Sequence, residues 1–130
     1  MKLNNYTILY VEDDIDTQEL MSNILKMTFG DVFVANNGEE GLELYKEKKP
    51  DIVLSDISMP VMDGLEMSEL IKEINPQQLI ALFTAFSDPE YQKKAAQLEI
   101  DTYIMKPLDE KQFFNSLNYL GMILHTQKQA

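Results

Sequence analysis

The chain has 130 residues, which suits a single domain with one hydrophobic core, and 45% of its residues are hydrophobic. It has no cysteine, which excludes a disulfide framework, and its net charge is −11, with lysine as its only basic residue apart from one histidine. Without arginine or net positive charge, we expect no direct nucleic-acid binding. We also expect a cytoplasmic protein with no membrane contact, because no apolar run could span a bilayer and the first five residues lack the apolar region of a signal peptide.

Short apolar runs alternate with longer amphipathic ones, which predicts βα units around a parallel sheet. The expected strands lie near Thr7–Val11, Val32–Ala35, Ile52–Ser55, Leu79–Thr84 and Thr102–Met105. Right-handed crossovers leave few topologies, and we predict an α/β fold of the flavodoxin-like, doubly wound (βα)5 type with strand order 2-1-3-4-5. We take residues 1–130 as one domain. The tail of the last helix, from about residue 125, would suit a linker into a further domain.

Apolar periodicity and capping residues place the helices. The first is expected over Ile15–Phe29, with Leu20, Ile24 and Met27 on one face and Gly30 ending it. The third helix is expected to have an apolar face at helical spacing, formed by Met67, Leu70, Ile71 and Ile74.

Proline and acidic residues mark the later helices. Asp88-Pro89 predicts the N-cap and first residue of the fourth helix. The last helix should begin near Asp109. The residues it is expected to bury are Phe113, Phe114, Leu117, Leu120 and Leu124.

Acidic side chains follow two of the predicted strands. Glu12, Asp13 and Asp14 come directly after the first strand, and Asp56 follows the third. These strands are neighbours in the predicted order, so their acids should meet at the edge where open α/β sheets bind ligands. Crowded carboxylates need a cation or raised pKa values, and oxygen ligands suit Mg²⁺.

Two further segments end at this edge, with Thr84 closing the fourth strand and Lys106 following the fifth. A carboxylate can act as a nucleophile toward phosphorus. A metal and a lysine would offset the charge of a phosphoryl group, and a hydroxyl could donate to its oxygens. Taken singly, each residue has an ordinary explanation as a cap, a turn residue or a solvated lysine. Their convergence favours phosphoryl chemistry.

The segments ILYVEDD, DIVLSDISMPVMDG, LFTA and YIMKP stand in the order and spacing of a known family. On these motifs the chain resembles the receiver domain of two-component response regulators over essentially its whole length. The resemblance implies a phosphorylation-controlled switch that takes its phosphoryl group from a sensor histidine kinase or phosphotransfer protein, with Mg²⁺ as cofactor. Its only catalytic activities would be autophosphorylation and slow autodephosphorylation.

The resemblance also implies roles for particular residues, with Asp56 as the phosphoacceptor. The groups expected to hold the metal are Glu12, Asp13, Asp56 and the backbone carbonyl of Ser58. The residues expected to contact the phosphoryl group are Thr84, Ala85 and Lys106. Glu12 departs from the aspartate common in many members.

Further roles implied by the resemblance concern signal output and lifetime. Thr84 and Tyr103 would form the switch, Ser58 and Phe86 would tune the phosphoryl lifetime, and the Lys106–Pro107 bond would be cis. Helix 4, strand 5 and helix 5 would present a surface to a downstream protein, an output domain or a second copy. Residues expected on it include Tyr91, Lys93, Lys94, Ile104 and Lys111.

Two other functions fit parts of the pattern. A Mg²⁺-dependent phosphatase with an aspartate nucleophile would typically carry an acid two residues after it, where this chain has Ser58. A flavin-binding electron carrier would need a hydroxyl- and glycine-rich phosphate loop after the first strand, where this chain has acids that repel phosphate.

Overall fold

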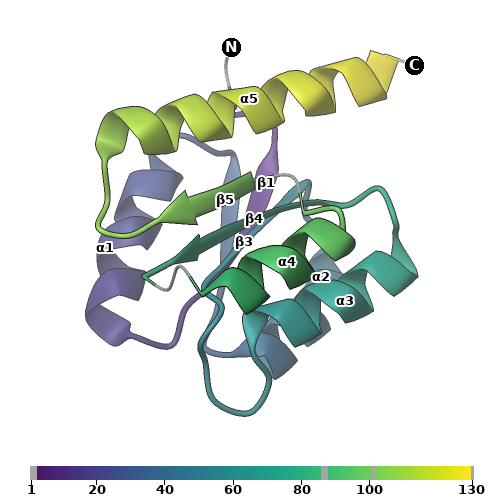
Figure 1. Ribbon diagram of the computed structural model, residues 1–130. Helices are drawn as coiled ribbons and strands as arrows, with labels where there is room; N and C mark the ends of the chain where they lie inside the picture. The colour runs from purple at the N-terminus through teal and green to yellow at the C-terminus, as the bar shows by residue number, and fades with distance from the viewer. Residues whose placement is uncertain (1–2, 86–87, 101, 130) are drawn as a thin grey trace.

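The computed structural model describes residues 3–85, 88–100 and 102–129. In these residues a parallel sheet has the predicted order β2-β1-β3-β4-β5 (Figure 1). Its strands are β1 (Thr7–Val11), β2 (Asp31–Ala35), β3 (Ile52–Ser55), β4 (Leu79–Thr84) and β5 (Thr102–Met105). The helices are α1 (Ile15–Lys26), α2 (Gly38–Lys48), α3 (Gly64–Ile74), α4 (Pro89–Gln97) and α5 (Glu110–Gln129). Within this described part of the chain, no helix has the length and apolar character needed to cross a membrane.

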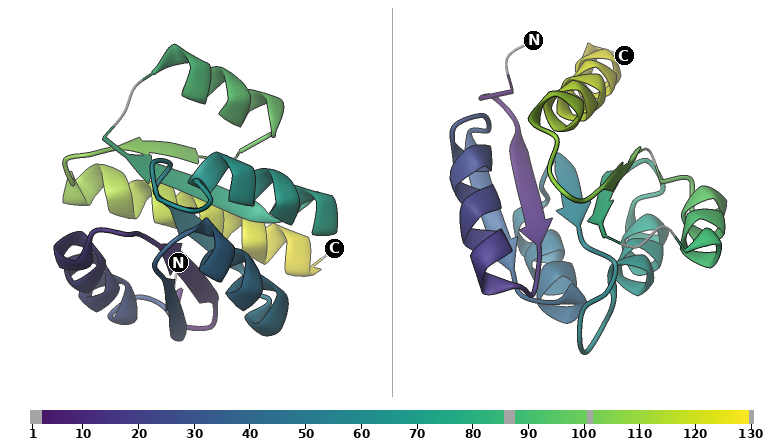
Figure 2. Two further views of the ribbon diagram at one scale, coloured as in Figure 1. Left: turned by 90° about the horizontal axis from the view of Figure 1, so that it is seen from below. Right: turned by 60° about the vertical axis from the view of Figure 1, so that its left-hand side comes forward.

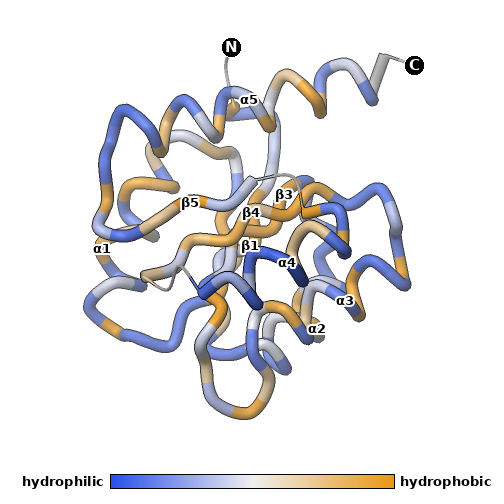
Figure 3. Tube along the Cα trace, in the orientation of Figure 1, coloured by the Kyte–Doolittle hydropathy of each residue, from blue (hydrophilic) through white to orange (hydrophobic). Residues whose placement is uncertain are grey.

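The sheet lies between two layers of helices, with α1 and α5 on one face and α2, α3 and α4 on the other (Figure 2). The strands form the apolar centre of the molecule (Figure 3). Alternate residues of a strand face opposite layers, so Tyr10 packs in the core with α1 and α5, whereas Leu9 and Val11 pack toward α2 and α3. Burial on both faces explains why these strands read as continuous apolar runs.

Side chains cap the starts of α3 and α4. Asp88 caps α4 by accepting a hydrogen bond from the Glu90 amide at 2.9 Å, with proline in the first turn, as predicted. Asp63 caps α3 and forms a reciprocal capping box with Glu66. After α4, Glu99 adopts a left-handed φ of 57°, a conformation that glycine adopts at lower cost.

The predicted buried face of α1 is wrong. Leu20 and Met27 are 58% and 89% exposed, while Met21 and Leu25 are buried and Ile24 is partly buried. Apolar residues at neighbouring positions of α1 offer two overlapping stripes, and packing against the sheet selects the one that contains Met21 and Leu25.

The predicted end of α1 is also wrong. The helix ends at Lys26, and the Phe29 ring is buried beyond it. Gly30 has no positive φ and is not a left-handed cap. It allows a close approach of two backbones, since a Cβ there would lie 2.5 Å from the Asn4 carbonyl oxygen. Its amide donates to the Tyr6 carbonyl oxygen at 2.9 Å.

The apolar residues predicted to be buried on α3 and α5 are confirmed in most positions. Met67 and Ile71 of α3 are buried, but Ile74 is 53% exposed because it lies at the end of the helix. The buried residues of α5 are Phe113, Leu117, Leu120 and Leu124, with Phe114 partly buried against them.

The connection from β3 to α3 passes close to the end of β3 at Gly64. The Gly64 amide donates to the Ile57 carbonyl oxygen at 2.8 Å. A Cβ at Gly64 would lie 2.0 Å from the Asp56 carbonyl oxygen, a backbone atom that cannot turn aside. Glycine therefore lets α3 start directly against the segment that carries Asp56.

We expect Gly64→Ala to lower the free energy of unfolding by about 1–3 kcal/mol or more, because it overpacks the backbone beside Asp56. At an unconstrained helix position the same exchange would stabilise the fold. Urea unfolding of Gly64→Ala and of Glu73→Ala, an exposed control on the same helix, measures the effect. A Gly64→Ala variant as stable as the parent would contradict the proposed close approach.

Candidate functional site

The ends of β1 and β3 bring two acidic residues side by side. Val11 pairs with Ser55, and each strand continues into its acid. The Asp56 amide donates to the Val11 carbonyl oxygen at 3.0 Å, and the Glu12 amide donates to the Ala35 carbonyl oxygen of β2 at 3.1 Å. Backbone hydrogen bonds to neighbouring strands thus fix both residues at the carboxyl edge of the sheet.

Glu12, Asp13 and Asp56 form an acidic cluster in which one carboxylate oxygen from each lies within 4.8 Å of the others. Glu12 is 1% exposed and Asp56 8%, whereas Asp13 is exposed. Clustered carboxylate oxygens open to solvent on one side suit a hard divalent cation that keeps several waters, so this donor set fits Mg²⁺.

Lys106 joins the two buried acids. Its Nζ atom lies 2.9 Å from Glu12 Oε1 and 3.1 Å from Asp56 Oδ2, and its side chain is 20% exposed. Its backbone amide donates to the Thr84 carbonyl oxygen at 2.8 Å, which ties it to the end of β4. The Nζ atom also lies 5.3 Å from the centroid of the Phe83 ring, within the range of a cation–π contact. The Lys106–Pro107 bond is cis, as expected.

Several donors fix Glu12 through its carboxylate and its backbone carbonyl. Its Oε2 accepts from the Asp14 amide at 3.2 Å, while its Oε1 accepts from Lys106 and, at 3.4 Å, from the Tyr10 hydroxyl. The Gln18 side-chain amide donates to the Glu12 carbonyl oxygen at 2.8 Å. Both carboxylate oxygens therefore have partners inside the protein before any metal is bound.

Burial and charge act in opposite directions on the site's titrating groups. Burial raises the pKa of Glu12, and the Asp56 charge adds to this, although the hydrogen bond from Lys106 opposes it. Burial lowers the pKa of Lys106, but the hydrogen bond to Glu12 and the charge of Asp56 outweigh it, so its pKa is raised. Lys106 therefore remains an ammonium ion at neutral pH.

Other predicted site residues that the structure describes lie in the loop after β3 and at the end of β4. Asp56 Oδ1 accepts from the Ile57 amide at 2.7 Å, and Ser58 is exposed in the loop that follows. Thr84, fully buried at the end of β4, is followed by the exposed Ala85. Phe86 lies outside the described residues.

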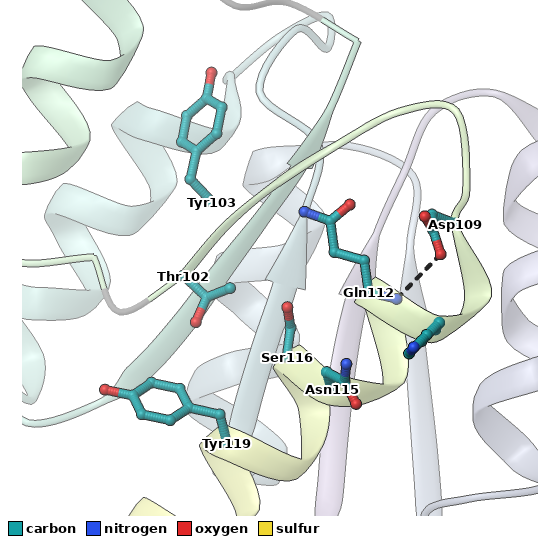
Figure 4. A pocket seen from close by; sticks show the side chains of 8 residues that line it. Thr102, Tyr103, Asp109, Gln112, Asn115, Ser116 and Tyr119 are labelled. Carbon is teal, nitrogen blue, oxygen red and sulfur yellow. Dashed lines mark hydrogen bonds between the residues drawn. The ribbon is translucent and has the colours of Figure 1, made fainter.

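Tyr103 of β5 is half-buried beside a pocket between β5 and α5 (Figure 4). In Figure 4 its hydroxyl points away from Gln112 and Tyr119, which line the α5 side of that pocket. Burial raises the pKa of Tyr103, so its hydroxyl stays protonated. The expectation that Ile104 contributes to a partner surface is wrong, because strand alternation places it in the core at 2% exposure.

Tyr10 and Phe83 contact the site but were read from sequence only as parts of apolar strands. Tyr10 lies two residues before Glu12, and two-residue spacing on a strand puts both side chains on one face. The two-residue spacing is therefore the sequence feature that could have predicted the contact between Tyr10 and Glu12. Phe83 precedes Thr84, but nothing in the sequence alone places its ring beneath Lys106.

Known proteins resemble this chain in sequence over most of its length. Chemotaxis protein CheY of Halobacterium salinarum is 35% identical over 111 residues, covering 85% of this chain and 92% of that protein. The cyclic di-GMP phosphodiesterase of Thermotoga maritima is 38% identical over 79% of this chain, but the match covers only 27% of that longer protein.

Solved structures show the same fold. The N-terminal domain of an uncharacterized Wolinella succinogenes protein has a TM-score of 0.88 and 33% identity, covering 95% of this chain and 99% of that one. The response regulator TrrA of Thermotoga maritima, solved in complex with Mg²⁺ and BeF, has a TM-score of 0.79 and 27% identity, covering 89% and 99%.

Fold and site together define a doubly wound α/β domain with an acidic, lysine-bridged edge. Residues 8–118 match the family described as the response regulator receiver domain, and the chain belongs to this family. Receiver domains are phosphorylation-controlled switches of two-component signalling.

We expect Lys106→Met to lower the free energy of unfolding by about 2–4 kcal/mol near neutral pH, because it leaves the buried Glu12 and Asp56 charges without their cation. The folded-state pKa of Glu12 is raised, so ionised Glu12 opposes folding, and losing Lys106 raises that pKa further. The deficit should therefore shrink as the pH falls through the folded-state pKa of Glu12.

Urea unfolding at about pH 7.5 and about pH 5.5 tests this pH dependence. Lys48→Met is the control, since the contacts of Lys48 lie away from the acidic cluster: an exposed pair with Glu47 at 3.7 Å and a cation–π contact with the Phe33 ring, 5.6 Å from its centroid. A deficit in Lys106→Met that does not change with pH would mean that Glu12 is not the group left unpaired.

Proposed function

We propose that this receiver domain accepts a phosphoryl group on Asp56 from a phosphohistidine of a sensor histidine kinase or phosphotransfer protein. The observation that carries the proposal is the Lys106 ammonium, which lies 3.1 Å from Asp56 at the acidic edge of the sheet. A lysine there holds the acceptor carboxylate in place and offers N–H donors to incoming phosphoryl oxygens.

The reaction is a transfer between two nucleophiles. A carboxylate oxygen of Asp56 forms a bond to phosphorus, while the bond between phosphorus and the imidazole nitrogen breaks and its electron pair stays on the imidazole. The hydrogen bond from the Ile57 amide at 2.7 Å orients the carboxylate for this step. Slow hydrolysis of the product by water would return Asp56 to its starting state.

Mg²⁺ is the cofactor that fits this donor set. Glu12, Asp13 and Asp56 would hold it, together with the Ser58 backbone carbonyl. When bound, it supplies positive charge that offsets the charge of the transferred group. The structure of TrrA in complex with Mg²⁺ and BeF supports the same cofactor here.

The output of the switch would run through Thr84 and Tyr103. Thr84, at the end of β4, would donate its hydroxyl to the phosphoryl group, and Tyr103 would respond by turning inward. Phosphorylation would change the surface formed by α4, β5 and α5, which includes Tyr91, Lys93 and Lys111. A downstream protein, an output domain or a second copy would bind there.

The lifetime of the phosphoryl group would depend on the residues that flank the attacking water. Ser58 is exposed two residues after Asp56 and has no amide or carboxylate to orient water from a distance. Phe86 would add an apolar shield. Both features favour a comparatively long-lived aspartyl phosphate.

The two competing functions have less support. Ser58 stands where an aspartate-nucleophile phosphatase typically has its second acid, and the acids after β1 would repel a flavin phosphate. We therefore propose that the chain has autophosphorylation and slow autodephosphorylation activity but no metabolic substrate.

We expect acetyl phosphate with Mg²⁺ to add the mass of one phosphoryl group to the parent protein, and Asp56→Asn or removal of Mg²⁺ to abolish the addition. An amide at position 56 lacks the nucleophilic oxygen. Asp14→Asn is the matched control, because Asp14 is an exposed acid beside the site and asparagine can also cap α1. Intact-mass spectrometry measures all forms, and full labelling of Asp56→Asn would overturn the assignment.

We also expect Thr84→Ala to be labelled on Asp56 yet to transmit less of the change to the surface formed by α4, β5 and α5. Its loss of the hydroxyl removes the donor that links the phosphoryl group to β4. Amide chemical-shift changes at Tyr91 and Lys111 on phosphorylation report the coupling, and Thr84→Ser should preserve it. Equal shifts in the parent and in Thr84→Ala would refute this route.

A further inference from the structure

Tyr10 places a phenol hydroxyl directly beneath the metal-binding edge. Its side chain is fully buried, and its hydroxyl donates to Glu12 Oε1 at 3.4 Å. The two residues are two positions apart in the extended chain, so both side chains lie on the α1 and α5 side of the sheet. A buried hydroxyl needs a partner, and among the described residues this carboxylate accepts its hydrogen bond.

Glu12 needs such support more than a shorter acid would. Glutamate has one more rotatable bond than aspartate, so orienting its carboxylate costs more conformational entropy. Lys106 bonds to Glu12 at 2.9 Å, but the same ammonium is shared with Asp56 at 3.1 Å. The Tyr10 ring is enclosed by the core, so its hydroxyl is a fixed donor that stays in place whichever acid Lys106 favours.

The Asp14 amide holds the other oxygen of Glu12, Oε2, at 3.2 Å. Donors on both oxygens define the rotation of the carboxylate as well as its position. Hydrogen bonds from outside the ligand set commonly orient ligating carboxylates in this way and so affect metal affinity.

We propose that the Tyr10 hydroxyl orients the Glu12 carboxylate toward Asp13 and Asp56, which makes Tyr10 a positioning residue for the divalent cation. The inference rests on the proposed Mg²⁺ site and adds to it a residue that is not itself a ligand. Losing the hydroxyl should weaken Mg²⁺ binding, because part of the binding free energy must then be spent on ordering Glu12.

The experiment measures the Mg²⁺ dissociation constant of the unphosphorylated protein by calorimetry or by NMR titration. We expect Tyr10→Phe, which keeps the ring, to raise this constant about threefold to tenfold. Tyr45→Phe is the matched control, since it removes another buried hydroxyl whose bond, to Gln78 at 2.9 Å, lies away from the acids. Tyr45→Phe should leave Mg²⁺ affinity unchanged.

A double-mutant cycle with Glu12→Asp separates positioning from packing. The aspartate side chain is one methylene shorter and cannot reach the Tyr10 hydroxyl, so adding Tyr10→Phe to Glu12→Asp should not weaken Mg²⁺ binding further. An equal loss in both backgrounds would show that Tyr10 acts through packing and would overturn the proposal. An unchanged or tighter affinity in Tyr10→Phe would also overturn it.

The parent protein provides a second measurement that does not depend on the folding of any variant. Titration with Mg²⁺ should shift the ring signals of Tyr10 and leave those of Tyr45 in place. A parent protein that binds no Mg²⁺ would instead refute the proposed cofactor. Binding without any response of the Tyr10 ring would refute the positioning role alone.

Discussion

The Lys106 ammonium is the contact on which the arrangement of the acidic edge depends. Glu12 and Asp56 are both buried, and with Asp13 they present carboxylate oxygens within 4.8 Å of one another. Such a cluster opposes folding unless a cation lies among the charges. Lys106 reaches both buried acids because the ends of β1, β3 and β5 meet at one edge, so the strand order and the stability of the site are coupled.

The strands and the start of α4 could be predicted because their signals are local and strong. The strand order followed from the right-handed crossovers between them, which leave few topologies, and that order brings the acids together. Strands buried on both faces give unbroken apolar runs, and Asp88-Pro89 marks a helix start through its own chemistry. The inward face of α1 could not be predicted, because Leu20 and Met21 are both apolar and periodicity alone permits either stripe. Which one is buried depends on how α1 packs against the sheet, which the sequence of the helix does not contain.

The same limit applies to the site. Glu12, Asp56 and Lys106 stand out as charges at strand ends, so topology alone brings them together. Tyr10 and Phe83 are hidden within apolar strands, and their contacts with charged groups depend on side-chain reach across the core. Contacts of aromatic side chains with charged groups, through a hydroxyl or a ring face, are therefore the part of such a site that sequence patterns tend to miss.

Phosphorylation would redistribute these contacts. The modified Asp56 would carry about two negative charges, and Lys106 has three N–H donors to share among its neighbours. Each donor that Lys106 turns toward the phosphoryl group is one withdrawn from Glu12. Glu12 would then depend more on the Asp14 amide and the Tyr10 hydroxyl, which stay fixed by the backbone and by the core. On the proposed phosphorylation of Asp56, the buried acid would thus remain ordered while its cation changes partner, and one lysine would stabilise both states of the switch.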